Sequence, residues 1–134
     1  MPGLRLEVVT PERTVLSDEA ESVIVPGFDG YIGFMQNHAP LVAGLTVGIV
    51  QFGPEHGEKR RIAVSGGFVE VADNRVTILA DTAELDNEID VGRAQAARER
   101  AERRLREQSE NIDRARAEAA LQRALNRLRA ARAI

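Results

Sequence analysis

The first 86 residues carry short apolar runs of the kind that form β-strands. Residues 4–9 alternate apolar and polar side chains with a period of two, and later runs at 21–25, 47–52, 61–64 and 75–80 are rich in β-branched residues. Turn-forming pairs such as Asp29-Gly30 and Asp73-Asn74 separate these runs. Many short strands with no long helix between them predict an antiparallel β-sandwich or a flattened barrel.

From residue 88 onward the pattern changes to one typical of helices. Proline is absent, Gly92 is the only glycine, and alanine, arginine, glutamate and leucine dominate. Small apolar residues recur at helical spacing on either side of a polar break at residues 108–111. The first set is Ala94, Ala97, Ala101 and Leu105, and the second is Ala117, Leu121, Ala124, Leu128 and Ala131. The sequence therefore predicts a β + α protein, with a sandwich over residues 1–86 and an antiparallel helical hairpin over residues 87–134.

Both helices have candidate caps. Asp90 marks the predicted start of the first helix, because its side chain can accept hydrogen bonds from the first free N–H groups. Ile89, one residue earlier, can pack on Ala94 as a hydrophobic staple. The candidate caps of the second helix are Ser109, Asn111 and Asp113.

The alanine-rich seam affects the expected stability of the hairpin. Alanine lets two helices approach closely but buries little apolar surface, at about 0.8 kcal/mol per buried CH₂. Helices of this length are marginal in water unless they are packed. We therefore expect the hairpin to be less stable than the sandwich and able to open without unfolding it.

Charge divides the chain at the same boundary. Residues 1–86 hold 6 Lys+Arg against 13 Asp+Glu, a net charge of −7, whereas residues 87–134 hold 12 against 8, a net charge of +4. Every basic residue of the second part is arginine. Most of these arginines fit a solvated helix face. Their planar guanidinium groups also suit carboxylates and phosphates, so the sequence indicates an anionic partner.

No catalytic constellation is evident in the sequence. Cysteine is absent, His38 and His56 lack a carboxylate at metal-ligand spacing, and Ser65 is not part of a nucleophile elbow. No glycine-rich phosphate loop is present. An overall acidic chain without stacking aromatics does not favour nucleic-acid binding. We therefore predict a non-catalytic protein without a metal site, and the lack of a signal peptide or long apolar run predicts a cytosolic one.

Four arginines are the strongest candidate site. In an antiparallel hairpin, Arg93 and Arg100 of the first helix lie beside Arg127 and Arg123 of the second. Converging guanidinium groups repel one another unless an anion such as a triphosphate lies between them. Spacing alone slightly favours the alternative, an arginine-rich solvent face with glutamate counter-charges.

Five stretches together resemble the epsilon subunit of the bacterial F-type ATP synthase. They lie at residues 30–33, 38–42, 63–71, 74–81 and 89–94, and the resemblance extends over essentially the whole chain. It implies a sandwich of about ten strands followed by a helical hairpin, in the central stalk of a rotary motor. The sandwich would bind the gamma subunit and the ring of c subunits. The hairpin would extend between the alpha and beta subunits of the catalytic head and inhibit ATP hydrolysis.

The resemblance also implies that ATP is a regulatory ligand of the hairpin. The family's Ile/Leu-Asp-x-x-Arg-Ala motif is present from Ile89 to Ala94. The residues that match the family's binding site are Glu84, Ile89, Asp90, Arg93, Ala94, Arg100, Arg123 and Arg127. Gln36-Asn37 and Tyr31 depart from the family pattern where the sandwich would face the c ring. The location implied is the cytoplasmic face of the cell membrane, reached only through the complex, and the alternative is an ATP-sensing module without an inhibitory role.

Overall fold

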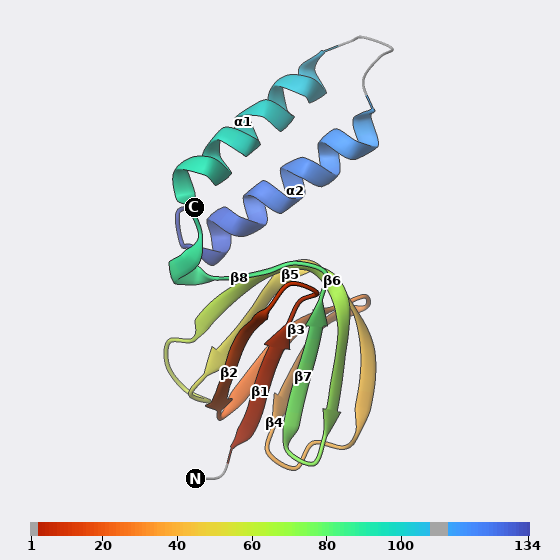
Figure 1. The fold of residues 1–134 in the computed structure, drawn as a ribbon, viewed down its shortest axis with the longest axis vertical. Helices are drawn as coiled ribbons and strands as arrows, with labels where there is room; N and C mark the ends of the chain where they lie inside the picture. Colours follow the sequence, from red (N-terminus) through yellow and green to blue (C-terminus); the bar gives the residue numbers. More distant parts are fainter. Residues whose placement is uncertain (1–2, 108–112) are drawn as a thin grey trace.

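A computed structural model describes residues 3–107 and 113–134 of the chain (Figure 1). A β-sandwich is followed by two helices that stand above one end of it, as the sequence predicts. The strands are β1 (Leu4–Val9), β2 (Thr14–Ala20), β3 (Ser22–Gly27), β4 (Gly30–Met35), β5 (Leu41–Gly53), β6 (Arg60–Ala72), β7 (Arg75–Ala80) and β8 (Ala83–Leu85). A 3₁₀ turn, η1 (Asp86–Glu88), leads into helices α1 (Val91–Arg106) and α2 (Arg114–Ala130).

The strands form one continuous sheet that folds over into two layers. Its order is β2-β1-β7-β6-β5-β3-β4, and β8 pairs with β6 off this path. One strand pair departs from the predicted antiparallel arrangement: β1 and β7 run parallel, with Leu6 opposite Val76. These two strands lie far apart in the chain, so no hairpin turn fixes their relative direction.

The described residues contain eight strands rather than about ten. The difference lies in β5 and β6, which are 13 residues long and pair with each other from Leu41↔Val71 to Phe52↔Arg60. The first part of β6 pairs with β8 and its second part with β7. Gly66 and Gly67 mark the bend between these parts, with φ angles of 104° and 120° that favour glycine. Counting each long strand as two would give ten.

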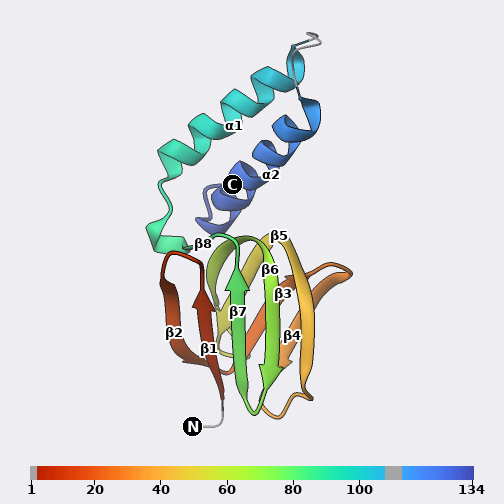
Figure 2. The same cartoon turned by 45° about the vertical axis from the view of Figure 1, so that its right-hand side comes forward.

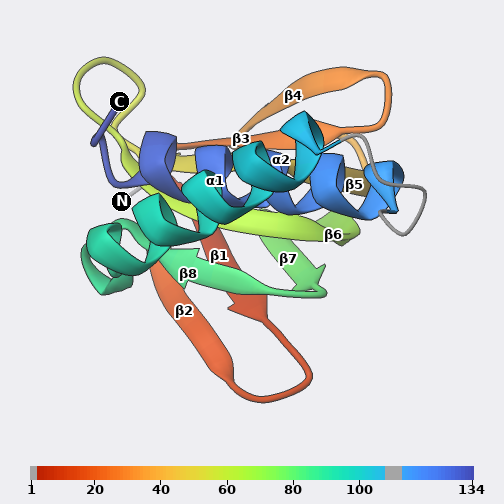
Figure 3. The same cartoon turned by 90° about the horizontal axis from the view of Figure 1, so that it is seen from above.

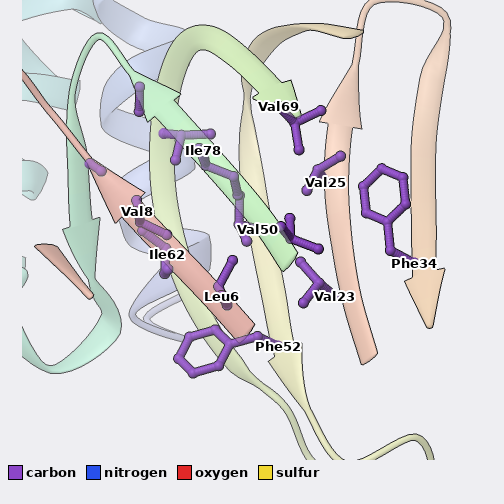
Figure 4. Packing of buried hydrophobic residues seen from close by; sticks show 14 of the residues in the cluster. Leu6, Val8, Val23, Val25, Phe34, Val50, Phe52, Ile62, Val69 and Ile78 are labelled. Atoms are coloured by element: carbon purple, nitrogen blue, oxygen red, sulfur yellow. The ribbon is translucent and has the colours of Figure 1, made fainter. Parts of the chain in front are cut away.

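The core of the sandwich is aliphatic, as expected from a chain with few aromatic residues. Leu6, Val23, Val50, Ile62 and Ile78 are fully buried at its centre (Figure 4). No residue of α1 or α2 belongs to this cluster. A second, smaller cluster of Ala63, Ile89 and Ala130 lies where the hairpin meets the sandwich.

The two helices begin at aspartates. Asp90 accepts a hydrogen bond from the backbone N–H of Arg93, and Asp113 accepts one from that of Arg116, each at 3.0 Å. Both predicted caps are therefore confirmed, whereas Ser109 and Asn111 fall outside the described residues. The seam is built of the buried residues Ala94, Ala101, Ala117, Ala124 and Leu128. Within the described residues, neither helix combines the length and the apolar character needed to cross a membrane.

Candidate functional site

A cavity of about 580 Å³ lies between the hairpin and one end of the sandwich. Its walls come from the β1–β2 turn, the β7–β8 turn, β8, η1, the first turns of α1 and one residue of α2 (Figure 2). This volume falls within the roughly 300–1,000 Å³ of small-molecule sites. A ligand in this cavity would touch the sandwich and both helices at once.

Most of the predicted site residues line this cavity. They are Glu84, Asp90, Arg93, Ala94, Arg100 and Arg127. Arg123 lines an adjoining small pocket that shares Glu84 and Arg127 with the first. Ile89 lies outside both and is buried against Ala63 and Ala130, so its place is structural. The antiparallel packing thus brings three of the four arginines to one cavity and the fourth to its neighbour.

The α1 side of the cavity carries positive charge. Asp90 and residues of the first turns of α1 line it, and the Asp90 side chain accepts the hydrogen bond from the backbone N–H of Arg93. Arg93 and Arg100 are exposed along the same wall. Neither guanidinium forms an ion pair with any carboxylate among residues 3–107 and 113–134. Two unengaged guanidinium groups can therefore donate to an anion.

Arg127 is already engaged on the opposite wall. Its Nε donates to Oε1 of Glu84, and both side chains are about one-third exposed. This ion pair ties α2 to β8 and leaves the terminal nitrogens of Arg127 for other acceptors. This wall of the cavity thus includes a direct contact between the hairpin and the sandwich.

The comparisons with known proteins agree with this architecture in both halves. Residues 3–86 match the family model described as ATP synthase, Delta/Epsilon chain, beta-sandwich domain, and residues 87–132 match its long alpha-helix domain. The chain belongs to the ATP synthase delta/epsilon family. By this membership it is a non-catalytic ATP synthase subunit.

Curated relatives from bacteria carry the family name. The ATP synthase epsilon chain of Moorella thermoacetica is 56% identical over 107 residues, which cover 80% of each chain. That of Symbiobacterium thermophilum is 55% identical over 112 residues, covering 83% of this chain and 80% of the relative. Among solved structures, a chain of the Euglena gracilis mitochondrial ATP synthase (OSCP/F1/c-ring) superposes with a TM-score of 0.78. It is 26% identical, and the match covers 98% of this chain and 82% of that one.

In this epsilon-family chain the hairpin is docked on the sandwich. The buried side chain of Asn126 donates from Nδ2 to the carbonyl oxygens of Gly48 at 2.7 Å and Val64 at 3.4 Å. Arg61 of β6 donates to the carbonyl oxygen of Arg129 at 2.7 Å. These contacts hold α2 against β5 and β6, as seen from above in Figure 3. Sequence reasoning missed them, because their acceptors are backbone carbonyl groups.

A cluster of charged residues at the end of the sandwich adds further contacts between the hairpin and the sandwich. Asp86 of η1 accepts hydrogen bonds from the Arg60 guanidinium at 2.8 Å and from the backbone N–H of Arg61 at 3.1 Å. Arg132, just after α2, approaches the same carboxylate at 3.7 Å and donates to the carbonyl oxygen of Lys59 at 2.6 Å. Burial opposes ionisation, but the hydrogen bonds from Arg60 and Arg61 hold the pKa of Asp86 below its ordinary value. The ionised form of Asp86 therefore stabilises the junction.

Sequence reasoning found Glu84 on the sandwich side of the cavity but missed an ion pair on the same wall. Arg13 and Glu88 line the cavity and form an ion pair at 3.2 Å. The hydrogen bond from Arg13, aided by the backbone N–H of Leu85, holds the pKa of Glu88 below its ordinary value against the opposing effect of burial. These residues are 75 positions apart, so only the folded chain brings them together.

Proposed function

We propose that this chain is the regulatory subunit in the central stalk of a proton-translocating ATP synthase. Its family membership in both halves supports this role. The sandwich would bind the gamma subunit and the c-subunit ring and turn with them, coupling their rotation to the alpha/beta catalytic head. The chain would stand at the cytoplasmic face of the membrane and be held there only through the complex.

The sandwich has a surface suited to a protein partner. Phe28, Phe68 and Leu79 are more than half exposed, and Phe68 pairs with Leu79 across β6 and β7 and with Gly44 across β5 and β6. The Phe28 ring lies against Gly44, so these side chains form one apolar row on the outer face of the sheet. An exposed apolar row of this kind favours burial by another protein. We assign it to the gamma subunit.

We further propose that ATP binds in the cavity between hairpin and sandwich as a regulatory ligand. The observation that carries this proposal is that residues of β8, α1 and α2 line one cavity in the docked form, so undocking the hairpin would separate its walls. Arg93, Arg100 and Arg127 would hold the phosphates, since guanidinium groups bind phosphate oxygens in bidentate fashion. A ligand that binds only the docked form must stabilise it by mass action.

The inhibitory form would be the undocked one. When the hairpin leaves the sandwich, its net charge of +4 becomes available to an acidic segment of the catalytic head. Binding there would hinder rotation and so inhibit ATP hydrolysis. ATP in the cavity would oppose this by keeping the hairpin docked.

Titration of the isolated chain with ATP tests the ligand proposal, with amide hydrogen exchange of α1 and α2 as the readout. ATP is expected to slow exchange in both helices, and Arg93→Ala to weaken binding about tenfold or more by calorimetry. Arg103→Ala removes an exposed α1 arginine that lies outside the cavity, so its affinity should match the wild type. Equal affinities for all three proteins would contradict the proposed site.

The inhibitory role is tested in the assembled enzyme. Deleting residues 88–134 should raise ATP hydrolysis under inhibitory conditions while assembly with the gamma subunit persists. If hydrolysis is unchanged but the intact chain still binds ATP, the alternative of an ATP-sensing module without an inhibitory role is favoured.

A further inference from the structure

The β1–β2 turn lies at the end of the sandwich next to the hairpin (Figure 2), and its residue Arg13 lines the cavity together with residues of α1. Hydrogen bonds with Thr10 fix this turn. The Thr10 backbone N–H donates to the Arg13 carbonyl oxygen at 2.9 Å, and the Arg13 N–H donates to the Thr10 hydroxyl oxygen at 3.3 Å. The backbone that carries the Arg13 side chain is therefore held in place.

Glu88 orients the Arg13 side chain but leaves part of it unused. Only Nη2 of Arg13 contacts the Glu88 carboxylate, at 3.2 Å from each oxygen. Nε and Nη1 make no hydrogen bond within residues 3–107 and 113–134, and the side chain is 47% exposed. Since a guanidinium group has five N–H donors, Arg13 can keep Glu88 and still bind an anion.

The cavity lining is not positive as a whole, so an anion must be held locally by the guanidinium groups. Four arginines and five carboxylates line the cavity. Three of these carboxylates are engaged: Glu84 with Arg127, Glu88 with Arg13, and Asp90 with the first turn of α1. Glu12 and Asp81 form no ion pair within the described residues. Guanidinium groups from the β1–β2 turn, α1 and α2 thus line one cavity, and a polyphosphate chain offers an oxygen acceptor to each of them.

We infer that Arg13 is a binding residue for the polyphosphate ligand of this cavity, contributed by the sandwich rather than by the hairpin. The inference rests on the proposed ATP site and extends it. A ligand held by Arg13 on one wall and by Arg93 and Arg100 on the other links the sandwich to α1 directly. Its binding energy then opposes undocking of the hairpin, and the β1–β2 turn becomes part of the regulatory switch.

Calorimetric titration of the full chain with ATP tests this inference in four proteins: wild type, Arg13→Ala, Arg13→Lys and Arg75→Ala. Arg75 is the matched control, because it is an exposed arginine paired with Glu7 at 3.5 Å and lies outside the cavity. Arg13→Ala should weaken ATP binding about tenfold, as loss of a charged hydrogen bond does. Arg13→Lys should lose less, since lysine keeps the charge without the planar fork.

The outcomes distinguish a failure of the Arg13 inference from a failure of the proposed ATP site. If the wild type binds ATP and Arg13→Ala matches Arg75→Ala, then Arg13 is not a binding residue although the ATP site stands. If the wild type does not bind ATP, both the site and the role of Arg13 are wrong. Thermal melts of all four proteins establish that any loss of affinity occurs in folded chains.

Discussion

The side-chain amide of Asn126 donates a hydrogen bond of 2.7 Å to the carbonyl oxygen of Gly48, which lies 78 positions earlier in the chain. Asn126 is 6% exposed and is one of two buried polar or charged residues in the described parts of the chain. The same nitrogen reaches the carbonyl oxygen of Val64, so one side chain connects α2 to both β5 and β6. The other buried residues of α2 are alanine and leucine. Their apolar side chains could pack equally well at several positions along a strand, because they form no directional hydrogen bond. Asn126 therefore fixes where the hairpin docks.

Replacing Asn126 by alanine should loosen the hairpin without unfolding the sandwich. The carbonyl oxygens of Gly48 and Val64 lose the buried Asn126 amide as a donor, which costs about 1–3 kcal/mol. Because no residue of α1 or α2 belongs to the sandwich core, the substitution should weaken the docking of the hairpin and leave the stability of the sandwich unchanged. Amide hydrogen exchange should accelerate about tenfold or more in α2 and remain unchanged in β1 and β7.

Gln122 provides the matched control for this substitution. It lies one turn earlier on α2 and is exposed. Gln122→Ala should therefore leave exchange in both helices unaltered. If Asn126→Ala and Gln122→Ala give the same exchange rates in α2, the buried amide does not determine how the hairpin docks on the sandwich.

Local features of this chain could be predicted from its sequence, whereas long-range contacts could not. The caps at Asp90 and Asp113 depend on the three following residues, and the alanine seam depends on helical spacing, so both patterns are visible in the chain itself. The parallel pairing of β1 with β7 follows from the folding of the whole sheet. The expected strand count is higher than the observed one because β5 and β6 are each one long strand, and in β6 Gly66 and Gly67 bend the strand without ending it.

The candidate site divides in the same way. Residues on the helices, such as Arg93 and Arg127, follow from the geometry of an antiparallel hairpin. Arg13 and Asn126 could not be predicted in this way. The partner of Arg13 is a carboxylate 75 positions away, and the partners of Asn126 are backbone carbonyl groups. No pattern of side chains along the sequence indicates which carbonyl groups of a strand lack a partner.

Acidification should weaken the junction through Asp86. Its folded-state pKa lies below the ordinary value of 3.8, so its ionised form stabilises the fold above that value, and this stability is lost as the pH falls through the lowered pKa. Asp86→Asn cannot ionise, so the wild type should be more stable than the variant above about pH 5 and lose that advantage at lower pH. Unfolding free energies of both proteins measured from pH 7 downwards test this. A difference that does not vary with pH would exclude the carboxylate as its cause.

Gly67 should be intolerant of a side chain. Its φ of 120° is one that L residues rarely adopt, and a Cβ atom there would lie 2.0 Å from the carbonyl oxygen of Leu79. Gly67→Ala should therefore destabilise the sandwich by about 3 kcal/mol or more in urea unfolding. At Gly33 no heavy atom lies within 4 Å of the added Cβ, so Gly33→Ala should change stability by less than about 0.5 kcal/mol. Similar losses at both positions would mean that the bend in β6 does not require glycine.

The sandwich should fold without the hairpin. Its core cluster contains no residue of α1 or α2, and the ion pair between Arg60 and Asp86 survives deletion of residues 88–134. The deletion removes the small cluster of Ala63, Ile89 and Ala130 and the polar and ionic contacts at the surface of the sandwich, such as those of Asn126, Glu88 and Arg127. The fragment should give a β-type circular dichroism spectrum and a cooperative melt less than about 10 °C below that of the full chain. A fragment that melts without cooperativity would show that the sandwich needs α2 in order to fold. The proposal that the hairpin undocks from an intact sandwich would then be wrong.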